Sequence, residues 1–269
     1  MVCEDLPFNG PRTLYPMSDA DTTVQWLDRE NGQRIAYHCR KGRGPGVVFL
    51  GGYASDMTGS KASYLDDWCC RHDRAFLRFD YSGHGQSSGS FSDGTIGSWT
   101  QDALAALDSL TEGPQILVGS SMGGWIMLNL ALQRPERIFG LIGIAAAPDF
   151  SQDLWFKLSP EQQDEVNTSD VIAFDEGGSH YAFTRAFFED GREKLLLRGP
   201  MAIDVPVRLL QGMQDSSVPW ETALEISRCM TGEDVVVSLI KDGDHRLSRD
   251  EDLACLGATI SELLGTAEP

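Results

Sequence analysis

One serine in this chain stands at the centre of a G-x-S-x-G pattern, Gly119–Gly123. A short β-prone apolar run, 115–118, precedes the pattern, and an apolar stretch, 124–132, follows it. This context predicts a strand, a sharp turn and a buried helix. Such a turn, the nucleophile elbow, strains the backbone of its central residue and raises the hydroxyl above a sheet. We therefore expect Ser121 to be a nucleophile, the alternative being a serine that only caps the helix.

A serine hydroxyl is a weak nucleophile, so it needs a base and an acid that orients the base. In folds with this elbow, the acid and then a histidine follow the serine, each on a loop after a strand. Asp215 and His245 occupy such positions, and the other histidines precede Ser121 or lie in a later aromatic-rich stretch. Asp149 also follows a predicted strand and competes as the acid. We favour Asp215 because it lies nearer the end of the chain, directly before a Val-Pro turn.

Glycines also follow an apolar run at 47–50, in the triplet Gly51–Tyr53. An acyl-transfer enzyme needs its second oxyanion amide at this point, although a plain strand-to-helix turn would use glycines in the same way. Asp80 and His84 lie in a glycine-containing loop after the next predicted strand. We expect these two side chains to tie down their own loop rather than to catalyse.

The predicted elements alternate between strand and helix from about residue 47 onward, after an antiparallel pair at 22–27 and 34–38. This alternation indicates a parallel sheet with right-handed crossovers and helices on both faces. The alternation stops at 150–199, which is rich in aromatic residues and predicts short helices. We interpret 1–149 and 200–269 as the core and 150–199 as a cap over the site. A second small domain with its own core is the alternative.

The composition is that of an ordinary globular protein, with 41% hydrophobic and 23% charged residues and a net charge of −18. The charge argues against nucleic acid and anionic membrane surfaces as partners. No apolar run is long enough for a membrane span, and residues 1–5 do not resemble a signal peptide. The six cysteines contain no C-x-x-C pattern. We expect reduced thiols, a cytoplasmic protein, and neither a metal site nor a cofactor.

The chain resembles the α/β-hydrolase superfamily over its whole length, and within it the acyl-glucuronide esterases and protein depalmitoylases of animal mitochondria. The matching stretches are 78–83, 113–125, 208–213, 218–220 and 244–246. The resemblance implies an α/β-hydrolase fold with a mostly parallel eight-stranded sheet and a small helical cap. One departure is Gly51, where the related family has proline.

Residue by residue, the resemblance makes Ser121 the nucleophile, Asp215 the acid and His245 the base. It also implies that the backbone amides of Tyr53 and Met122 form the oxyanion hole. The expected substrate pocket is apolar.

We expect Gly52, Trp125 and Trp220 to line that pocket near the elbow. The resulting hypothesis is a serine hydrolase that cleaves carboxylic esters, acyl thioesters or S-acylated proteins through an acyl-enzyme. The alternatives are a carbon–carbon bond hydrolase with the same triad and a non-catalytic ligand-binding member of the fold.

Overall fold

The computed structural model describes residues 23–30, 32–176 and 179–265. The predicted N-terminal arm, 1–20, lies outside this part of the chain. The strands are β1 (Gln25–Asp28), β2 (Arg34–Arg40), β3 (Arg43–Leu50), β4 (Arg74–Phe79), β5 (Gln115–Ser120), β6 (Ile138–Ile144), β7 (Val171–Glu176), β8 (Ser179–Thr184), β9 (Val207–Gly212) and β10 (Val235–Ile240). The helices are α1 (Ser60–Arg71), α2 (Ile96–Leu110), α3 (Met122–Gln133), α4 (Phe150–Lys157), α5 (Pro160–Ser169), α6 (Arg185–Glu193), α7 (Glu221–Cys229) and α8 (Asp250–Gly265), with short 3₁₀ helices η2 (Phe91–Asp93) and η3 (Pro135–Arg137).

Eight strands form one sheet in the order β1-β2-β4-β3-β5-β6-β9-β10. β1 pairs antiparallel with β2, and β2 pairs antiparallel with β4. The pairs from β4 to β10 are all parallel. This is the mostly parallel α/β-hydrolase sheet that the sequence predicted. Because parallel strands are joined by crossovers, their carboxyl ends meet at one edge, and the loops that follow them converge there.

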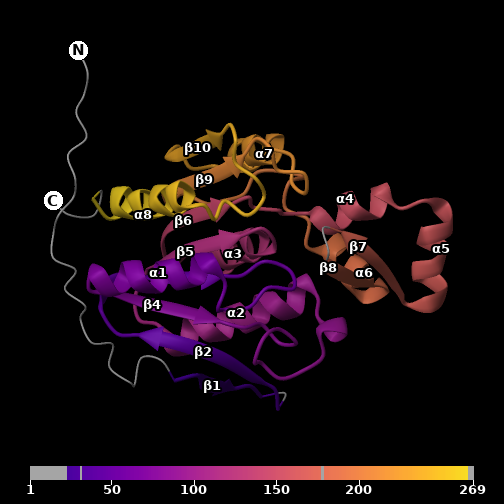
Figure 1. Cartoon of the computed structure of the whole chain (residues 1–269), viewed down its shortest axis with the longest axis horizontal. Coiled ribbons are helices and arrows are strands. Elements are labelled where there is room, and N and C mark those ends of the chain that lie inside the picture. Colours follow the sequence, from indigo (N-terminus) through magenta and orange to yellow (C-terminus); the bar gives the residue numbers. More distant parts are fainter. Residues whose placement is uncertain (1–22, 31, 177–178, 266–269) are drawn as a thin grey trace.

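Helices cover both faces of the sheet, as alternate residues of β3 illustrate. Val48 and Leu50 belong to a core cluster with α2 and α3. Val47 and Phe49 point to the opposite face and pack in a second cluster with α1 and α8. A central strand that is apolar on both faces is required by this sandwich, since neither face meets water. Figure 1 shows α1 and α8 crossing the sheet together.

The segment 150–199 forms a layer beside the sheet, at the right of Figure 1. It contains α4, α5 and α6, as expected, but also the antiparallel hairpin β7–β8. The short helices predicted for this segment are present, and the hairpin is an element that the sequence analysis did not predict. The ends of the hairpin alternate in burial, with Ile172 and Phe183 buried and Val171 exposed, and this period of two favours strands. The division of the chain into a core and a cap insertion stays a prediction.

No described helix is long and apolar enough to cross a membrane.

Candidate active site

Ser121 lies at the turn between β5 and α3, with φ 53° and ψ −119°. These angles are strained for a residue with a side chain. The turn is held by β6: the amide of Ser121 donates to the carbonyl of Ile144 at 2.9 Å, and the amide of Ala147 donates to the carbonyl of Ser121 at 3.0 Å. The strained conformation is thus fixed by a neighbouring strand, which is how an elbow presents one side chain at the sheet's edge.

The two glycines of the pattern allow the elbow to close. A Cβ atom on Gly119 would stand 2.5 Å from the carbonyl oxygen of Gly123. A Cβ atom on Gly123 would overlap the carbonyl oxygen of Leu50, at the end of β3. The elbow therefore presses directly against the end of β3. A larger residue at Gly123 would push the two apart, and one at Gly119 would push β5 away from the first turn of α3.

The loop after β3 brings Gly51–Tyr53 beside the elbow. A Cβ atom on Gly52 would lie 3.4 Å from the Cβ atom of Ser121. Met122 is the first residue of α3, and the first amides of a helix have no acceptor within that helix. The structure thus brings the loop of Tyr53 and the amide end of α3 to the same side of the sheet as Ser121.

The side chain of Tyr53 connects this loop to the 150–199 segment. Its ring stacks on Phe183 of β8, with centroids 4.8 Å apart, and meets Phe187 edge-on at 5.7 Å. Its hydroxyl donates a hydrogen bond to the backbone carbonyl of Ala182. Burial raises the pKa of Tyr53 well above its usual value, so the hydroxyl keeps its proton and remains a donor. The loop of Tyr53 and the hairpin β7–β8 are therefore in direct contact.

His245 and Asp215 meet, although 30 residues separate them in the sequence. The Nδ1 atom of His245 lies 2.8 Å from the Oδ2 atom of Asp215, whose side chain is fully buried. The other carboxylate oxygen accepts two backbone amides, from Ser217 and Val218, each at 2.8 Å. Burial acts to raise the pKa of Asp215, but these hydrogen bonds outweigh it and lower the pKa below its usual value. Asp215 is thus an ionised acceptor for the imidazole.

Asp149, the rival acid, is engaged elsewhere. Its two carboxylate oxygens accept the backbone amides of Leu196 and Leu197 at 2.8 and 2.9 Å. It has φ 62° and stands at the N-cap position of α4, where its side chain makes no cap hydrogen bond. Its carboxylate instead joins the beginning of the 150–199 segment to its end. The structure therefore pairs His245 with Asp215 and gives Asp149 a structural partner.

Of the three residues expected in the pocket, Gly52 lies against Ser121 and the two tryptophans differ in burial. Trp125 is fully buried in α3, where its indole nitrogen donates to the carbonyl of Lys194 at 3.1 Å. Its ring meets Phe150 edge-on. Trp220 is half-buried and precedes α7. Trp125 thus packs against the 150–199 segment, and the composition of a substrate pocket stays a prediction.

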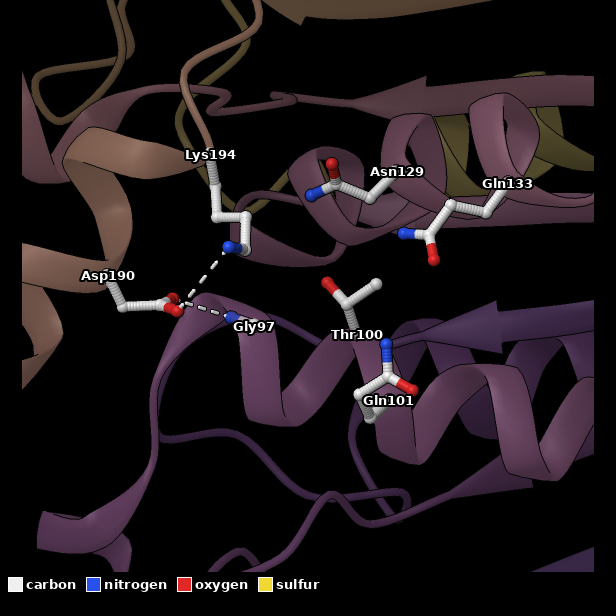
Figure 2. Close-up of a pocket in the computed structure, with 7 residues that line it drawn as sticks. All are labelled: Gly97, Thr100, Gln101, Asn129, Gln133, Asp190 and Lys194. Carbon is white, nitrogen blue, oxygen red and sulfur yellow. Dashed lines mark hydrogen bonds and ion pairs between the residues drawn. The ribbon is translucent and has the colours of Figure 1, made fainter.

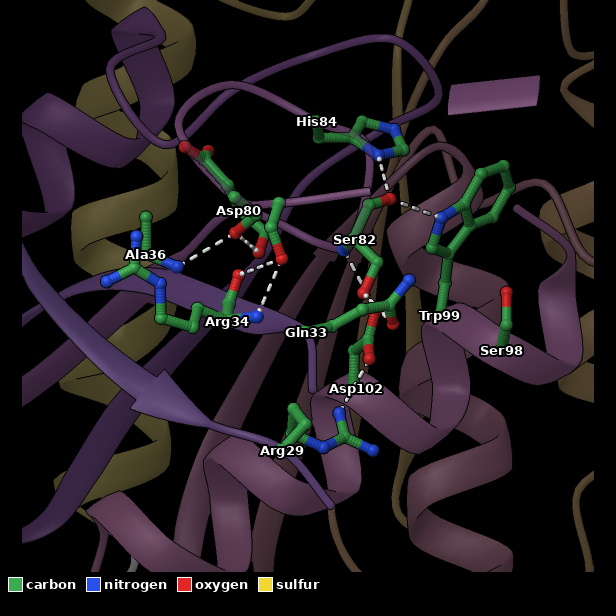
Figure 3. Close-up of polar contacts among 12 residues, drawn as sticks. Arg29, Gln33, Arg34, Ala36, Asp80, Ser82, His84, Ser98, Trp99 and Asp102 are labelled. Atoms are coloured by element: carbon green, nitrogen blue, oxygen red, sulfur yellow. Dashed lines mark hydrogen bonds and ion pairs between the residues drawn. The ribbon is translucent and has the colours of Figure 1, made fainter. Parts of the chain in front are cut away.

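Asp80 and His84 occupy a buried network beneath this edge (Figure 3). The carboxylate of Asp80 accepts the amides of Met57 and Gln86 at 2.7 and 2.8 Å, which ties two loops together. Burial lowers the pKa of His84 to about 4, so its ring is neutral at pH 7. Its Nδ1 atom and the indole of Trp99 both face the carbonyl of Ser82. The contacts made by both residues fit the expected loop-holding role.

A polar cleft of about 250 Å³ lies between α2, α3 and the end of α6 (Figure 2). Its lining residues are Gly97, Thr100, Gln101, Asn129, Gln133, Asp190 and Lys194. Asp190 accepts the amide of Gly97 at 2.7 Å, close to the N-terminus of α2, where a carboxylate is favoured. None of the predicted site residues lines this cleft. The contact between Asp190 and Gly97 inside it joins α6 to α2.

Sequence reasoning did not single out Lys61 of α1. Its ammonium donates to the backbone carbonyl of Arg246, the residue that follows His245. The lysine and the histidine loop lie far apart in the chain, so no local pattern indicated the contact. A lysine in the first turn of a helix ordinarily predicts a solvated surface position.

Comparison with known proteins places these observations in a family. A family model described as serine aminopeptidase, S33, matches residues 46–165. The mitochondrial palmitoyl-protein thioesterase ABHD10 of Rattus norvegicus is 39% identical over 247 residues, which cover 90% of this chain and 83% of the relative. ABHD10 of Homo sapiens is 38% identical over 262 residues, covering 96% of this chain and 85% of the relative.

Solved structures agree with the sequence comparison. Mouse α/β-hydrolase domain-containing protein 10 superposes with a TM-score of 0.87 at 38% identity, covering 91% of this chain and 100% of that one. A putative hydrolase from Agrobacterium vitis S4 superposes with a TM-score of 0.85 at 38% identity, covering 90% and 98%. The expectation of a cytoplasmic protein was wrong by this comparison, because the relatives in rat and human are mitochondrial proteins by name. That expectation rested on reduced cysteines and on residues 1–5 not resembling a signal peptide, and neither feature distinguishes the cytosol from a mitochondrion.

Proposed function

Because this chain belongs to the family of the palmitoyl-protein thioesterase ABHD10 within the α/β hydrolases, we propose that it hydrolyses ester and thioester bonds through Ser121, His245 and Asp215. The observation that carries the proposal is the contact of 2.8 Å between His245 and the buried carboxylate of Asp215. This pair lies on loops that follow β10 and β9, at the same sheet edge as the strained Ser121.

The proposed reaction has two halves. An ionised Asp215 holds the proton of His245 on Nδ1, which leaves Nε2 as the base. Nε2 takes the proton of the Ser121 hydroxyl while the Oγ atom of Ser121 attacks the acyl carbonyl carbon. The carbonyl oxygen becomes an oxyanion, which the amides of Tyr53 and Met122 would stabilise. The bond from the acyl carbon to the leaving oxygen or sulfur then breaks, and His245 gives its proton to the leaving group.

Water completes the second half. His245 takes a proton from the water molecule, whose oxygen attacks the acyl-enzyme carbonyl. The bond from the acyl carbon to the Ser121 oxygen breaks, and the proton on His245 returns to that oxygen. The products are a free carboxylic acid and an alcohol or a thiol.

For the substrate class, we infer an apolar acyl group. The aromatic rings of the cap, including Phe183 and Phe187, pack on Tyr53 beside the elbow, so acyl carbons bound there would leave water. The relatives are named for palmitoyl-protein thioesters, which favours an acyl thioester over the carbon–carbon substrates of other members of the fold. An S-acylated protein or a small acyl ester fits this class.

Activity measurements on Ser121→Ala test the mechanism. We expect turnover of p-nitrophenyl butyrate and of palmitoyl-CoA to fall by several orders of magnitude, because the members of a triad act as a unit. Ser120→Ala is the matched control, since Ser120 is the buried last residue of β5. It should stay within a few-fold of wild type. Comparable activity in the Ser121→Ala enzyme would exclude Ser121 as the nucleophile.

An acyl-length series tests the substrate class. Each buried methylene contributes about 0.8 kcal/mol, so catalytic efficiency on C2 to C16 p-nitrophenyl esters should rise with length until the pocket is full. The matching acyl-CoA thioesters should give the same trend. A preference for acetyl over every longer chain would contradict an apolar acyl pocket.

A further inference from the structure

Lys61 connects helix α1 to the loop that carries the proposed base. It lies in the first turn of α1, directly after the loop that begins with Gly51–Tyr53. Its Nζ atom donates to the backbone carbonyl of Arg246, and the Oγ atom of Ser248 lies 3.4 Å from it. In the sequence, Lys61 is separated from Arg246 by 185 positions and from Ser248 by 187. One side chain thus connects the start of α1 to the residues that immediately follow His245.

The surroundings of Lys61 disfavour the charged form of its amine. Burial lowers its pKa to about 8, Asp244 and Asp252 act in the opposite direction, and Arg246 adds to the decrease. Across the part of the chain that the structure describes, Lys61 makes no ion pair with a carboxylate. A half-buried charge that binds only a backbone carbonyl and a hydroxyl adds little stability, so an apolar residue of similar size would serve the fold about as well.

The histidine loop already has its own internal supports. The carboxylate of Asp244 accepts the amides of Arg246 and Leu247 at 3.0 and 2.9 Å, which shapes the turn. The side chain of Leu247 is buried in the core cluster below α1 and α8. These contacts set the conformation of the loop. The bond from Lys61 is different because it fixes the loop against α1, and through it against the Gly51–Tyr53 loop.

We propose that Lys61 is a positioning residue for His245, which it acts on by clamping the carbonyl of Arg246 to the first turn of α1. This inference rests on the proposed function of His245 as the base. Catalysis depends on the placement of the base relative to the serine within about 1 Å, a displacement that can cost about a hundredfold in rate. A clamp of this kind affects the chemical step and leaves the apolar acyl pocket unchanged.

Lys61→Met tests the proposal, because it keeps the length of the side chain and removes the donor. We expect kcat on p-nitrophenyl butyrate to fall by about tenfold to a hundredfold, with KM within about twofold of wild type. The melting temperature should be equal to or higher than that of wild type, because a desolvated charge is gone. Labelling of Ser121 by a fluorophosphonate should slow in parallel with kcat, since both need the base. A kcat within twofold of wild type would overturn the proposal.

Two further variants make the test specific. Lys61→Arg keeps charged donors and should recover part of the lost kcat; an arginine variant no better than the methionine one would count against the hydrogen bond. Lys41→Met is the matched control, since Lys41 is exposed between β2 and β3, and it should match wild type in both kcat and melting temperature. If Lys61→Met does not fold, Lys61→Gln, whose donor is too short to reach, decides by the same criteria.

The proposed function and this inference fail in distinguishable ways. An active Ser121→Ala enzyme would refute the proposed function whatever Lys61 does. An inactive Ser121→Ala enzyme beside a fully active Lys61→Met enzyme would refute only the positioning role.

Discussion

The imidazole of His245 and the carboxylate of Asp215 lie 2.8 Å apart, on loops that follow adjacent strands of the sheet. The side chain of Asp215 is inaccessible to solvent, while that of His245 is 30% exposed. The imidazole is therefore held at Nδ1 by a buried carboxylate, while part of its side chain remains accessible. A general base that must exchange protons with a substrate needs this asymmetry.

The acid assignment predicts a clear ranking of two variants. Asp215→Asn should lower kcat by about 10³- to 10⁴-fold, because an amide favours the wrong tautomer of His245. Asp149→Asn is the matched control, since its carboxylate binds only backbone amides in the contacts described, and its kcat should stay within about tenfold of wild type. Steady-state kinetics on p-nitrophenyl butyrate will rank them. The opposite order would move the acid to the loop after β6.

Strain at the elbow predicts that stability and activity separate at Ser121. Its φ of 53° suits glycine better than any residue with a Cβ atom. The free energy of unfolding of Ser121→Gly should therefore exceed that of Ser121→Ala by about 1 kcal/mol, and its melting temperature should be higher. Both variants should be inactive. Thermal unfolding of the two variants side by side measures the difference. Equal melting temperatures would mean that the turn stores no strain.

The elbow and the sheet were predictable because their signals are local. Two glycines flank Ser121 within five residues. An apolar run such as Val47–Leu50 indicates a buried parallel strand even when its neighbouring strands are unknown. The hairpin β7–β8 was missed because residues 171–174 form a short unbroken apolar run, which does not distinguish a strand from a buried helix by its periodicity. The order of strands and the carboxyl-edge rule then brought Asp215 and His245 together.

What escaped prediction depends on contacts between distant segments. The role of Asp149 required the backbone of Leu196 and Leu197, which no spacing in the sequence relates to it. In the sequence, Lys61 likewise resembles any surface lysine, because its contact with Arg246 appears only when α1 and the loop of His245 are placed in space. Trp125 was expected near the pocket because it lies one turn after Ser121. In the structure, Trp125 is completely buried, and residues of the 150–199 segment pack against it. Sequence patterns do not show where that segment lies in space.

From the hydrogen bond between Tyr53 and Ala182 we predict that the 150–199 segment influences the loop that carries the proposed oxyanion amide. Tyr53→Phe keeps the ring on Phe183 but removes the hydroxyl that binds β8. A lost hydrogen bond of about 1 kcal/mol corresponds to a fall of roughly fivefold in kcat if the loop amide loses its fixed position. Inhibition by a trifluoromethyl ketone, which forms an oxyanion on Ser121, should weaken by a similar factor.

The control for this variant is Tyr37→Phe, which removes a hydroxyl bonded to Gln25 at the far edge of the sheet. It should change neither kcat nor ketone inhibition. If Tyr53→Phe gave wild-type values in both measurements, the contact between cap and loop would have only a packing role.

Lys61 predicts that activity and stability respond oppositely to alkaline pH. Burial lowers its pKa in the folded chain to about 8, against about 10.4 in the unfolded chain. Between these values the unfolded chain binds more protons, so the contribution of Lys61 to stability becomes more favourable as pH rises. A neutral amine is a weaker donor to the carbonyl of Arg246, so kcat should fall over the same range.

The charged groups around Lys61 are Asp244 and Arg246 on the histidine loop and Asp252 on α8. The alkaline change is expected from the lysine itself, because its lowered pKa lies near pH 8. We expect kcat to decline above about pH 8 in wild type and to hold until about pH 10 in Lys61→Arg, whose guanidinium stays charged. The free energy of unfolding of wild type relative to Lys61→Met should rise over that interval. Identical alkaline limbs in wild type and Lys61→Arg would show that another group controls the decline.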